Sequence, residues 1–188
     1  MRACSARKSV GRAHHRREDS PMIRMTSEAD LPVLRDIERA AGRQFAEIGM
    51  MTVATDEPPA PEVFAERHSH GRVWVYVDES DTPIAFAMVG VVDGTAHLEQ
   101  VSVHPDHAGE RIGQALIGRV LSWARANGFP TLTLTTFAEV PWNGPYYERL
   151  GFRPLTRSEE TPGLRAIRAA EAAHGLDRWP RICMRIDV

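Results

Sequence analysis

The sequence predicts a mixed α/β fold, of the α+β class, built around one mixed β-sheet. Residues 72–103 hold three β-rich runs separated by turn residues, which predicts an antiparallel meander. The third run is followed by an amphipathic helix and another β-rich run that ends at Phe137. Such a strand–helix–strand crossover makes its two strands parallel. The chain has 188 residues, of which 43% are hydrophobic, so we expect one compact domain.

The elements before the meander are predicted from hydrophobic spacing. Residues 23–25 form a short strand, and residues 29–41 carry apolar side chains at helical spacing up to Gly42, which ends the helix. Residues 43–61 are expected to be irregular apart from one helical turn. Residues 61–68 form a short helix that begins with a proline.

The meander itself consists of residues 73–77, 84–92 and 95–103, with a hairpin turn at Asp93-Gly94. The alternation along its third strand places four side chains on one face: His97, Glu99, Val101 and Val103. The elements expected after it are a long helix ending at Asn127-Gly128, a strand at 131–137, a short helix at 142–150, a strand starting at Phe152, an inserted helix at 162–174 and a final strand at 181–188.

The first 21 residues differ from the rest of the chain. They contain six basic residues, two acidic ones and almost no large apolar side chains, which predicts a disordered basic extension preceding a single domain at 22–188. The formal charge of the whole chain is only −2, so nucleic-acid binding is not expected. A nucleic-acid-binding protein that acts through the basic arm remains a less favoured alternative.

Cysteine content and hydropathy indicate a cytoplasmic protein. The cysteines, Cys4 and Cys183, lie near opposite ends of the chain, which argues against a disulfide framework and a thiolate metal cluster. No apolar run approaches the roughly 18 residues of a membrane-spanning helix. His97, His104, His107 and Asp106 straddle a strand and a turn, so we expect no metal site there.

The loop from His104 to Gly113 brings small residues and backbone N–H groups to the start of a helix. Helix N-termini attract phosphate groups. Gly109 and Gly113 give only G-x-x-x-G, which is neither a dinucleotide fingerprint nor a P-loop. On these residues alone, a plain tight turn stays open as an alternative.

Three segments carry a family resemblance: LEQVSVHP at 98–105, GERIGQAL at 109–116 and YYERLGF at 146–152. Together they resemble the GNAT superfamily of acetyl-CoA-dependent N-acetyltransferases, over roughly residues 23–152 and the last strand. The resemblance implies a central, twisted, mixed but mostly antiparallel sheet of about six to seven strands with helices on both faces. It also implies acetyl-CoA as co-substrate.

The family writes its phosphate-binding motif Arg/Gln-x-x-Gly-x-Gly/Ala. Ala108 and Arg111 depart from its first and middle positions, whereas Gly113 fits the last. The backbone donors remain available, and Arg111 adds a positive charge. The coenzyme-binding residues that the resemblance implies are Val101, Ser102, Val103, Gly109, Glu110, Arg111, Ile112, Gly113 and Gln114.

Acetyl transfer to an amine requires a proton acceptor, a donor to the acyl oxygen and a proton for the departing thiolate. The resemblance places Glu99 beside the thioester as the acceptor, with a carboxylate paired to an arginine as the structural alternative and His97 as the rival base. The amide of Val101 would meet the acyl oxygen. Tyr147 is the implied proton donor, with ordinary helix packing as its alternative.

The implied reaction is direct attack by a primary amine of a small molecule or peptide in a ternary complex. The acceptor pocket would use Glu38, Phe45, Glu47, Met50 and His97. The inserted helix caps this pocket, makes a homodimer contact or is a connector; the sequence leaves all three open. A non-catalytic acyl-CoA-binding regulatory module is the alternative function, because two motif positions depart.

Overall fold

The computed structural model describes residues 22–188, so the predicted basic extension lies outside the described part of the chain. The strands are β1 (Ile23–Met25), β2 (Val73–Val77), β3 (Pro83–Val92), β4 (Thr95–Val103), β5 (Thr131–Phe137), β6 (Arg153–Pro154) and β7 (Arg181–Asp187). The α-helices are α1 (Leu31–Gly42), α2 (Met51–Ala54), α3 (Pro61–Ser69), α4 (Ile112–Ala126), α5 (Gly144–Arg149) and α6 (Pro162–Ala173). Short 3-10 turns are η1 (Glu28–Asp30), η2 (Arg43–Ile48), η3 (Pro105–His107) and η4 (Leu176–Arg178).

The strands form one seven-stranded sheet in the order β1-β2-β3-β4-β5-β7-β6. Strands β2, β3 and β4 pair as an antiparallel meander, and β4 pairs with β5 in parallel. Strand β7 returns between β5 and β6 and is antiparallel to both. The predicted α+β class and the mixed, mostly antiparallel sheet are therefore confirmed.

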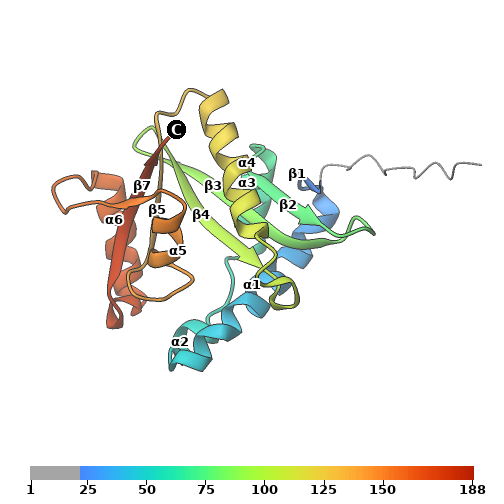
Figure 1. Ribbon diagram of the computed structural model, residues 1–188, viewed down its shortest axis with the longest axis horizontal. Coiled ribbons are helices and arrows are strands. Elements are labelled where there is room, and N and C mark those ends of the chain that lie inside the picture. The colour runs from blue at the N-terminus through green and yellow to red at the C-terminus, as the bar shows by residue number, and fades with distance from the viewer. Residues whose placement is uncertain (1–21) are drawn as a thin grey trace, which may run out of the picture.

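Helices cover both faces of this sheet (Figure 1). One apolar core lies between α4 and the sheet, with Leu116 and Val120 packed against β-strand residues such as Leu132. The opposite core contains Leu34 of α1 and Phe64 of α3, packed against Phe86 of β3. These cores hold the middle of the sheet rigidly between two helical layers.

The chain between α1 and α3 is more helical than the sequence predicts. Although α1 ends at Gly42, residues 43–48 continue directly as η2, and α2 follows after Gly49. The expectation of an irregular segment after Gly42 is therefore wrong for residues 43–54, which hold more than the one helical turn expected, whereas residues 56–60 lie in no helix. Phe45 and Met50 turn inward and join Phe137 in a third apolar cluster, and this tertiary contact stabilises turns that lack local sequence signals.

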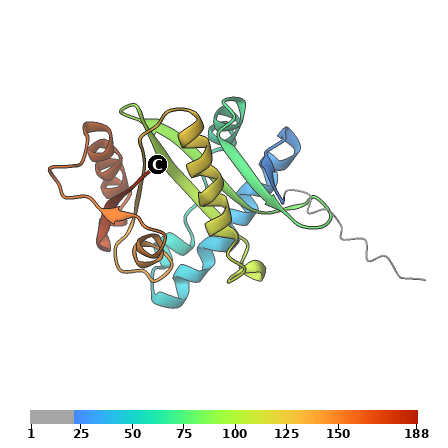
Figure 2. The same ribbon diagram turned by 45° about the horizontal axis from the view of Figure 1, so that its top comes forward.

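Helix α6 packs on the same sheet face as α1. Its Glu171 accepts hydrogen bonds from Thr135 of β5 and from Arg181 of β7, at 2.5 and 2.6 Å. Its N-terminus is fixed by Asp93, whose carboxylate accepts a 2.7 Å hydrogen bond from the Gly163 N–H. Figure 2 shows α6 beside β7, far from α4. Across residues 22–188, no helix combines the length and apolar character needed to span a bilayer.

Candidate functional site

Strands β4 and β5 separate toward their C-terminal ends. They pair only where Ala96, His97 and Leu98 face Leu132, Thr133 and Leu134. Strand β4 continues to Val103 and β5 to Phe137, and neither continuation is paired with the other. The β5-side edge of residues 99–103 is thus an unpaired strand edge inside the sheet, which an extended ligand can join by backbone hydrogen bonds.

A β-bulge in β4 changes the face of the sheet to which its side chains point. Gln100 pairs with Met88 and Leu98 pairs with Val89, so Glu99 is an extra residue without a register partner. The predicted common face of His97, Glu99, Val101 and Val103 is therefore wrong. Val101 and Val103 pack in the core beneath α4, whereas Glu99 bonds to α3 on the opposite face. The extra residue shifts the two-residue alternation by one position.

The loop before α4 places backbone N–H donors at the start of this helix. Gly109 and Arg111 both have positive φ, of 86° and 60°, and Arg111 occupies the N-cap position without a side-chain cap hydrogen bond. The first amides of α4, at Ile112, Gly113 and Gln114, have no acceptor within the helix. A Cβ at Gly113 would lie 3.9 Å from a Val101 methyl group, so this helix start sits beside β4. Uncapped donors and the helix dipole favour an anion here.

The remaining coenzyme-loop side chains take less part in this arrangement. Glu110 is exposed, and its Oε1 lies 3.4 Å from Nδ1 of His107, so its carboxylate is directed along the loop. Ser102 is buried, and its hydroxyl accepts a 2.8 Å hydrogen bond from Gln100. These contacts leave the main chain, rather than these side chains, as the candidate anion-binding part of the loop.

The two tyrosines of α5 occupy different environments. Tyr146 extends toward the start of α4, where its hydroxyl would lie 3.0 Å from a Cβ at Gly113. Tyr147 packs edge-on against Phe152, with ring centroids 5.5 Å apart. Burial raises the pKa of Tyr147, so its hydroxyl keeps its proton at neutral pH. Sequence reasoning assigned Tyr146 no role, yet the structure brings it against the anion-binding loop.

Glu99 is held by an arginine. Arg67 of α3 donates to both carboxylate oxygens, at 2.7 and 2.8 Å. A methyl group at Gly90 would collide with the same carboxylate, so the glycine on β3 makes room for it. The structure therefore contains the ion pair that was the alternative reading of Glu99. Arg67 could not be found from sequence, because its partner is 32 residues away.

His97 is buried beside this pair. Its Nδ1 lies 2.9 Å from the Thr133 hydroxyl, which in turn donates to the carbonyl of Ala96 at 3.1 Å. Since the hydroxyl proton is used toward Ala96, Nδ1 carries the imidazole proton and Nε2 keeps a lone pair. Burial lowers the pKa of His97, against the opposing charges of Glu99 and Glu171. His97 is therefore a neutral imidazole whose Nε2 keeps its lone pair.

Only some of the predicted acceptor residues lie near the C-terminal end of β5. Phe45 packs 5.6 Å from both Phe137 and Trp142, measured between ring centroids. Met50 is 2% exposed and belongs to the same apolar cluster. Glu47 is exposed on η2. The aromatic cluster thus places Phe45 and Met50 beside the β5–α5 loop and leaves Glu47 at the surface.

Glu38, on α1, is half-buried, and one of its two carboxylate oxygens is shielded from solvent. Its Oε2 is shielded from solvent and has no hydrogen-bond partner among the described residues. Burial raises the pKa of Glu38 to about 7; the charge of Asp56 acts in the same direction and that of Arg35 opposes it. A buried carboxylate without a partner costs stability and is typical of a binding site.

Two residues of the β5–α5 loop, Trp142 and Asn143, were not predicted to bind ligand. Asn143 occupies the N-cap position of α5, but its side chain makes no cap hydrogen bond and donates instead to Thr136 at 3.0 Å. Its Oδ1 and the indole Nε1 of Trp142 are both buried without partners in the described part of the chain. The only signal in the sequence was that both side chains carry polar atoms at the start of a helix. A helix cap explains such residues equally well.

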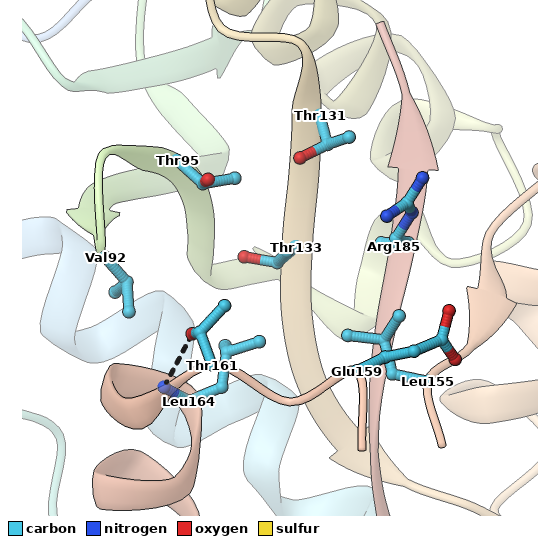
Figure 3. Close-up of a pocket in the computed structure, with 9 residues that line it drawn as sticks. All are labelled: Val92, Thr95, Thr131, Thr133, Leu155, Glu159, Thr161, Leu164 and Arg185. Carbon is cyan, nitrogen blue, oxygen red and sulfur yellow. Dashed lines mark hydrogen bonds between the residues drawn. The ribbon is translucent and has the colours of Figure 1, made fainter. Parts of the chain in front are cut away.

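A separate cleft of about 130 Å³ lies at the other end of β4 and β5 (Figure 3). The side chains of Thr95, Thr131 and Thr133 face it from the strands, and Leu164 of α6 closes one side. Thr135, the next residue of β5 on this face, is bonded to Glu171. The Glu171 contacts therefore lie between this cleft and the widening of the sheet. No group of three metal-ligating side chains gathers anywhere within residues 22–188.

Comparisons with known proteins point to one family. The family model described as "Acetyltransferase (GNAT) family" matches residues 34–152, more than half of the chain. The chain is also 29% identical over 87 residues to the peptidyl-lysine N-acetyltransferase YjaB of Escherichia coli. That match covers 46% of this chain and 53% of YjaB, so it spans about half the length of this curated relative.

Solved structures share the fold. A GNAT-family acetyltransferase of Staphylococcus aureus superposes with a TM-score of 0.68 at 11% identity, covering 88% of this chain and 97% of that one. The ribosomal-protein-S18-alanine N-acetyltransferase of Escherichia coli gives 0.62 at 23% identity, with 88% and 92% covered. The PaiA N-acetyltransferase of Thermoplasma acidophilum, solved with coenzyme A, gives 0.62 at 14% identity, with 88% and 98% covered.

Proposed function

The chain belongs to the GNAT acetyltransferase family, and from this premise we propose that it is an N-acetyltransferase that moves an acetyl group from acetyl-CoA to a primary amine. One observation carries the proposal. An unpaired edge of β4 lies beside an uncapped helix N-terminus, and two potential proton acceptors project from the opposite face of the same strand. In the proposed reaction the amine attacks directly within a ternary complex.

The described residues fit the coenzyme. The amides of Ile112, Gly113 and Gln114 would hold its pyrophosphate, with the Arg111 guanidinium as an added charge-assisted donor. The unpaired edge at Val101–Val103 would accept the extended arm, and the Val101 amide would donate to the acyl oxygen. Acetyl-CoA supplies an activated acyl group and a thiolate leaving group. Coenzyme A in the PaiA structure supports the same partner here.

His97 is better suited than Glu99 to receive the proton of the amine. Both oxygens of Glu99 already accept hydrogen bonds from Arg67. Among the described contacts of His97, only Nδ1 is bonded, so Nε2 is left to accept a proton directly or through water. The charge of Glu99 favours the protonated imidazole and thereby assists the transfer. Glu99 would then act on the reaction by positioning and charge.

Tyr147 would donate a proton to the departing thiolate. Its raised pKa keeps the hydroxyl protonated, and the neighbouring Tyr146 reaches the loop that would hold the pyrophosphate. Helix α5 would thus connect coenzyme binding and proton donation within two adjacent residues. The acceptor would enter from the face that carries Glu38, Phe45, Met50 and His97, with Glu47 at the rim.

The proposal is tested by incubating the purified full chain with acetyl-CoA and a panel of primary amines while free CoA thiol is measured. Amine-dependent release is expected, and loss of a general base or acid lowers it by roughly 10²–10⁴-fold. His97→Gln and Tyr147→Phe should show that loss, and Glu99→Gln a smaller one.

Binding without turnover would favour the alternative, a non-catalytic acyl-CoA-binding module, which is motivated by Arg111 at a motif glycine. Heat on addition of acetyl-CoA with no amine-dependent thiol release from any amine would be that result. A larger loss in Glu99→Gln than in His97→Gln would instead transfer the role of base to Glu99.

A further inference from the structure

Among the described residues, no cation forms an ion pair with Glu38. Arg35, three residues before it on α1, donates to the carbonyl groups of Pro58 and Pro59 at 3.4 and 3.1 Å and lies 3.5 Å from the Glu57 carboxylate. Arg39 is bonded to Asp36 and Glu57 on the exposed side of the helix. A buried carboxylate left without a partner destabilises the fold. The packing of α1 does not require it, because Leu34 and Ile37 already fill the core contact with the sheet.

The surroundings of Glu38 are suited to an organic ligand. Glu38 and Phe45 are seven residues apart on the continuous path of α1 and η2, which places them on the same side two turns apart. Phe45 contacts Trp142 of the β5–α5 loop. That loop adds an indole N–H and the Asn143 carbonyl oxygen, both buried and without partners among the described residues. Helix α1, the aromatic contact and this loop thus supply a carboxylate, an aromatic surface and two unused polar groups.

Resting on the proposed function, we infer that the acceptor is an amine with a second positive charge and that Glu38 binds this charge. One nitrogen of the acceptor, deprotonated, attacks the thioester. The other, an ammonium or guanidinium group, forms a charge-assisted hydrogen bond with the Glu38 carboxylate. The hydrocarbon between them lies against Phe45, and aromatic faces attract a nearby cation. The substrate class is thus a terminal diamine or an amino-guanidine.

The test compares terminal diamines of increasing chain length, each beside the monoamine of the same length. Values of KM and kcat are measured for the wild-type chain, Glu38→Gln and Asp36→Asn. Asp36 is a matched control because it lies on the same helix with its carboxylate in solvent. We expect the wild type to prefer one diamine over its monoamine. In Glu38→Gln the KM for that diamine should rise about tenfold, the factor of one hydrogen bond to a charged group, with the monoamine unchanged.

The possible outcomes separate the two proposals. If the chain releases CoA with monoamines and diamines alike, or if Glu38→Gln impairs both equally, the inference about Glu38 is wrong while N-acetyl transfer stands. If no amine gives CoA release in any variant, the proposed function itself fails. Asp36→Asn should behave as the wild type, and a loss of diamine preference in this control would also overturn the assignment.

A binding measurement checks the same contact without turnover. With CoA present, the preferred diamine should raise the melting temperature of the wild type, because a ligand bound to the folded state stabilises it. The shift should disappear in Glu38→Gln and persist in Asp36→Asn. An equal shift in all three chains would place the diamine elsewhere on the protein.

Discussion

Arg111 has a left-handed backbone conformation at the residue where the coenzyme loop becomes α4. For a residue with a Cβ this conformation costs roughly 1–2 kcal/mol. The strain fixes the directions of the amides that follow it, and the side chain adds a positive charge beside them. Arg111, which departs from the family motif, can therefore adopt the backbone geometry of the loop, but at an energetic cost.

Arg111→Gly is expected to stabilise the chain by about 1 kcal/mol, because glycine adopts this conformation without a steric penalty. The same change removes a charged donor and should weaken acetyl-CoA binding severalfold. Urea unfolding and calorimetry measure the two effects. Lower stability, or unchanged affinity, would contradict this account of Arg111.

Glu38 makes stability depend on pH in a predictable direction. Its pKa is raised on folding from 4.5 to about 7. An acid with a raised pKa binds its proton more tightly in the folded state, so the free energy of unfolding falls as pH rises through this window. The loss is complete once the pH exceeds the folded pKa.

Glu38→Gln should therefore stabilise the chain by about 2 kcal/mol above neutral pH and have little effect below the unfolded pKa. Thermal or urea unfolding of both chains across this pH range measures the difference. Asp36→Asn serves as the control, because its carboxylate lies on the same helix in solvent. A difference that is constant with pH would show that Glu38 is not a strained carboxylate.

At the scale of elements, α5 depends on a close approach to the end of β5. A Cβ at Gly144 would collide with the carbonyl oxygen of Ala138 and lie 3.0 Å from that of Phe137. Both neighbours are backbone atoms that have little freedom to move. This contact sets the position of Tyr146 and Tyr147 relative to the widened gap between β4 and β5.

Gly144→Ala is expected to destabilise the chain by roughly 2 kcal/mol and to displace α5, which should lower acetyl transfer. Gly118→Ala is the matched comparison, because Gly118 lies within α4 and has open space where a Cβ would lie. That substitution should stabilise by up to about 1 kcal/mol through helix propensity. If both substitutions had the same effect on stability, the close approach of the backbone at Gly144 would not be what excludes a side chain there.

Across the whole molecule, the parallel pairing between the β1–β4 part of the sheet and the β5–β7–β6 part is short. On the second part, α6 is tied down through Glu171, which bonds to Arg168, Arg181 and Thr135. Burial alone would raise the pKa of Glu171, but the hydrogen bonds from Arg181 and Thr135 hold it below its ordinary value. Another contact, from His174 to Asp56 at 3.1 Å, joins α6 to the segment after α2.

Glu171→Gln should cost roughly 3 kcal/mol at neutral pH, because it leaves the partly buried Arg181 without its anion and removes one of the two anionic partners of Arg168. The Glu171 contribution is fully present above the unfolded pKa of 4.5 and is lost as pH falls through the lower folded value. The variant should lack this acid-induced loss. Unfolding measured from acidic to neutral pH would reveal it, and parallel curves for the two chains would contradict the assignment.

Hydrophobic spacing predicted most of the fold. The stripes of α1, α4 and α6 and the β-rich runs of the meander correspond to observed elements, because burial on one face imposes the same period on sequence and structure. Only one helical turn was expected within residues 43–61, and the others at 43–54 were missed, since their stability comes from Phe137 and Trp142, far along the chain. The bulge at Glu99 was also missed. Its signal was present in the three-residue spacing between Leu98 and Val101, both of which face α4.

The candidate site was predictable only where local sequence determines it. The loop at 109–114 depends on glycines and a helix start, which a short motif records. The Arg67–Glu99 pair, the His97–Thr133 hydrogen bond and the orphaned groups of Trp142 and Asn143 depend on contacts between distant elements. No single-sequence pattern specifies such pairs.

The central claim is that α4 amides and the free edge of β4 hold acetyl-CoA together. Amide chemical shifts recorded during titration of the full chain with acetyl-CoA test it most directly. The account predicts saturable shifts concentrated at residues 109–114 and 99–103, with smaller changes at Tyr146 and Tyr147. Saturable shifts confined to the cleft beneath α6, or no shifts in either segment, would contradict it.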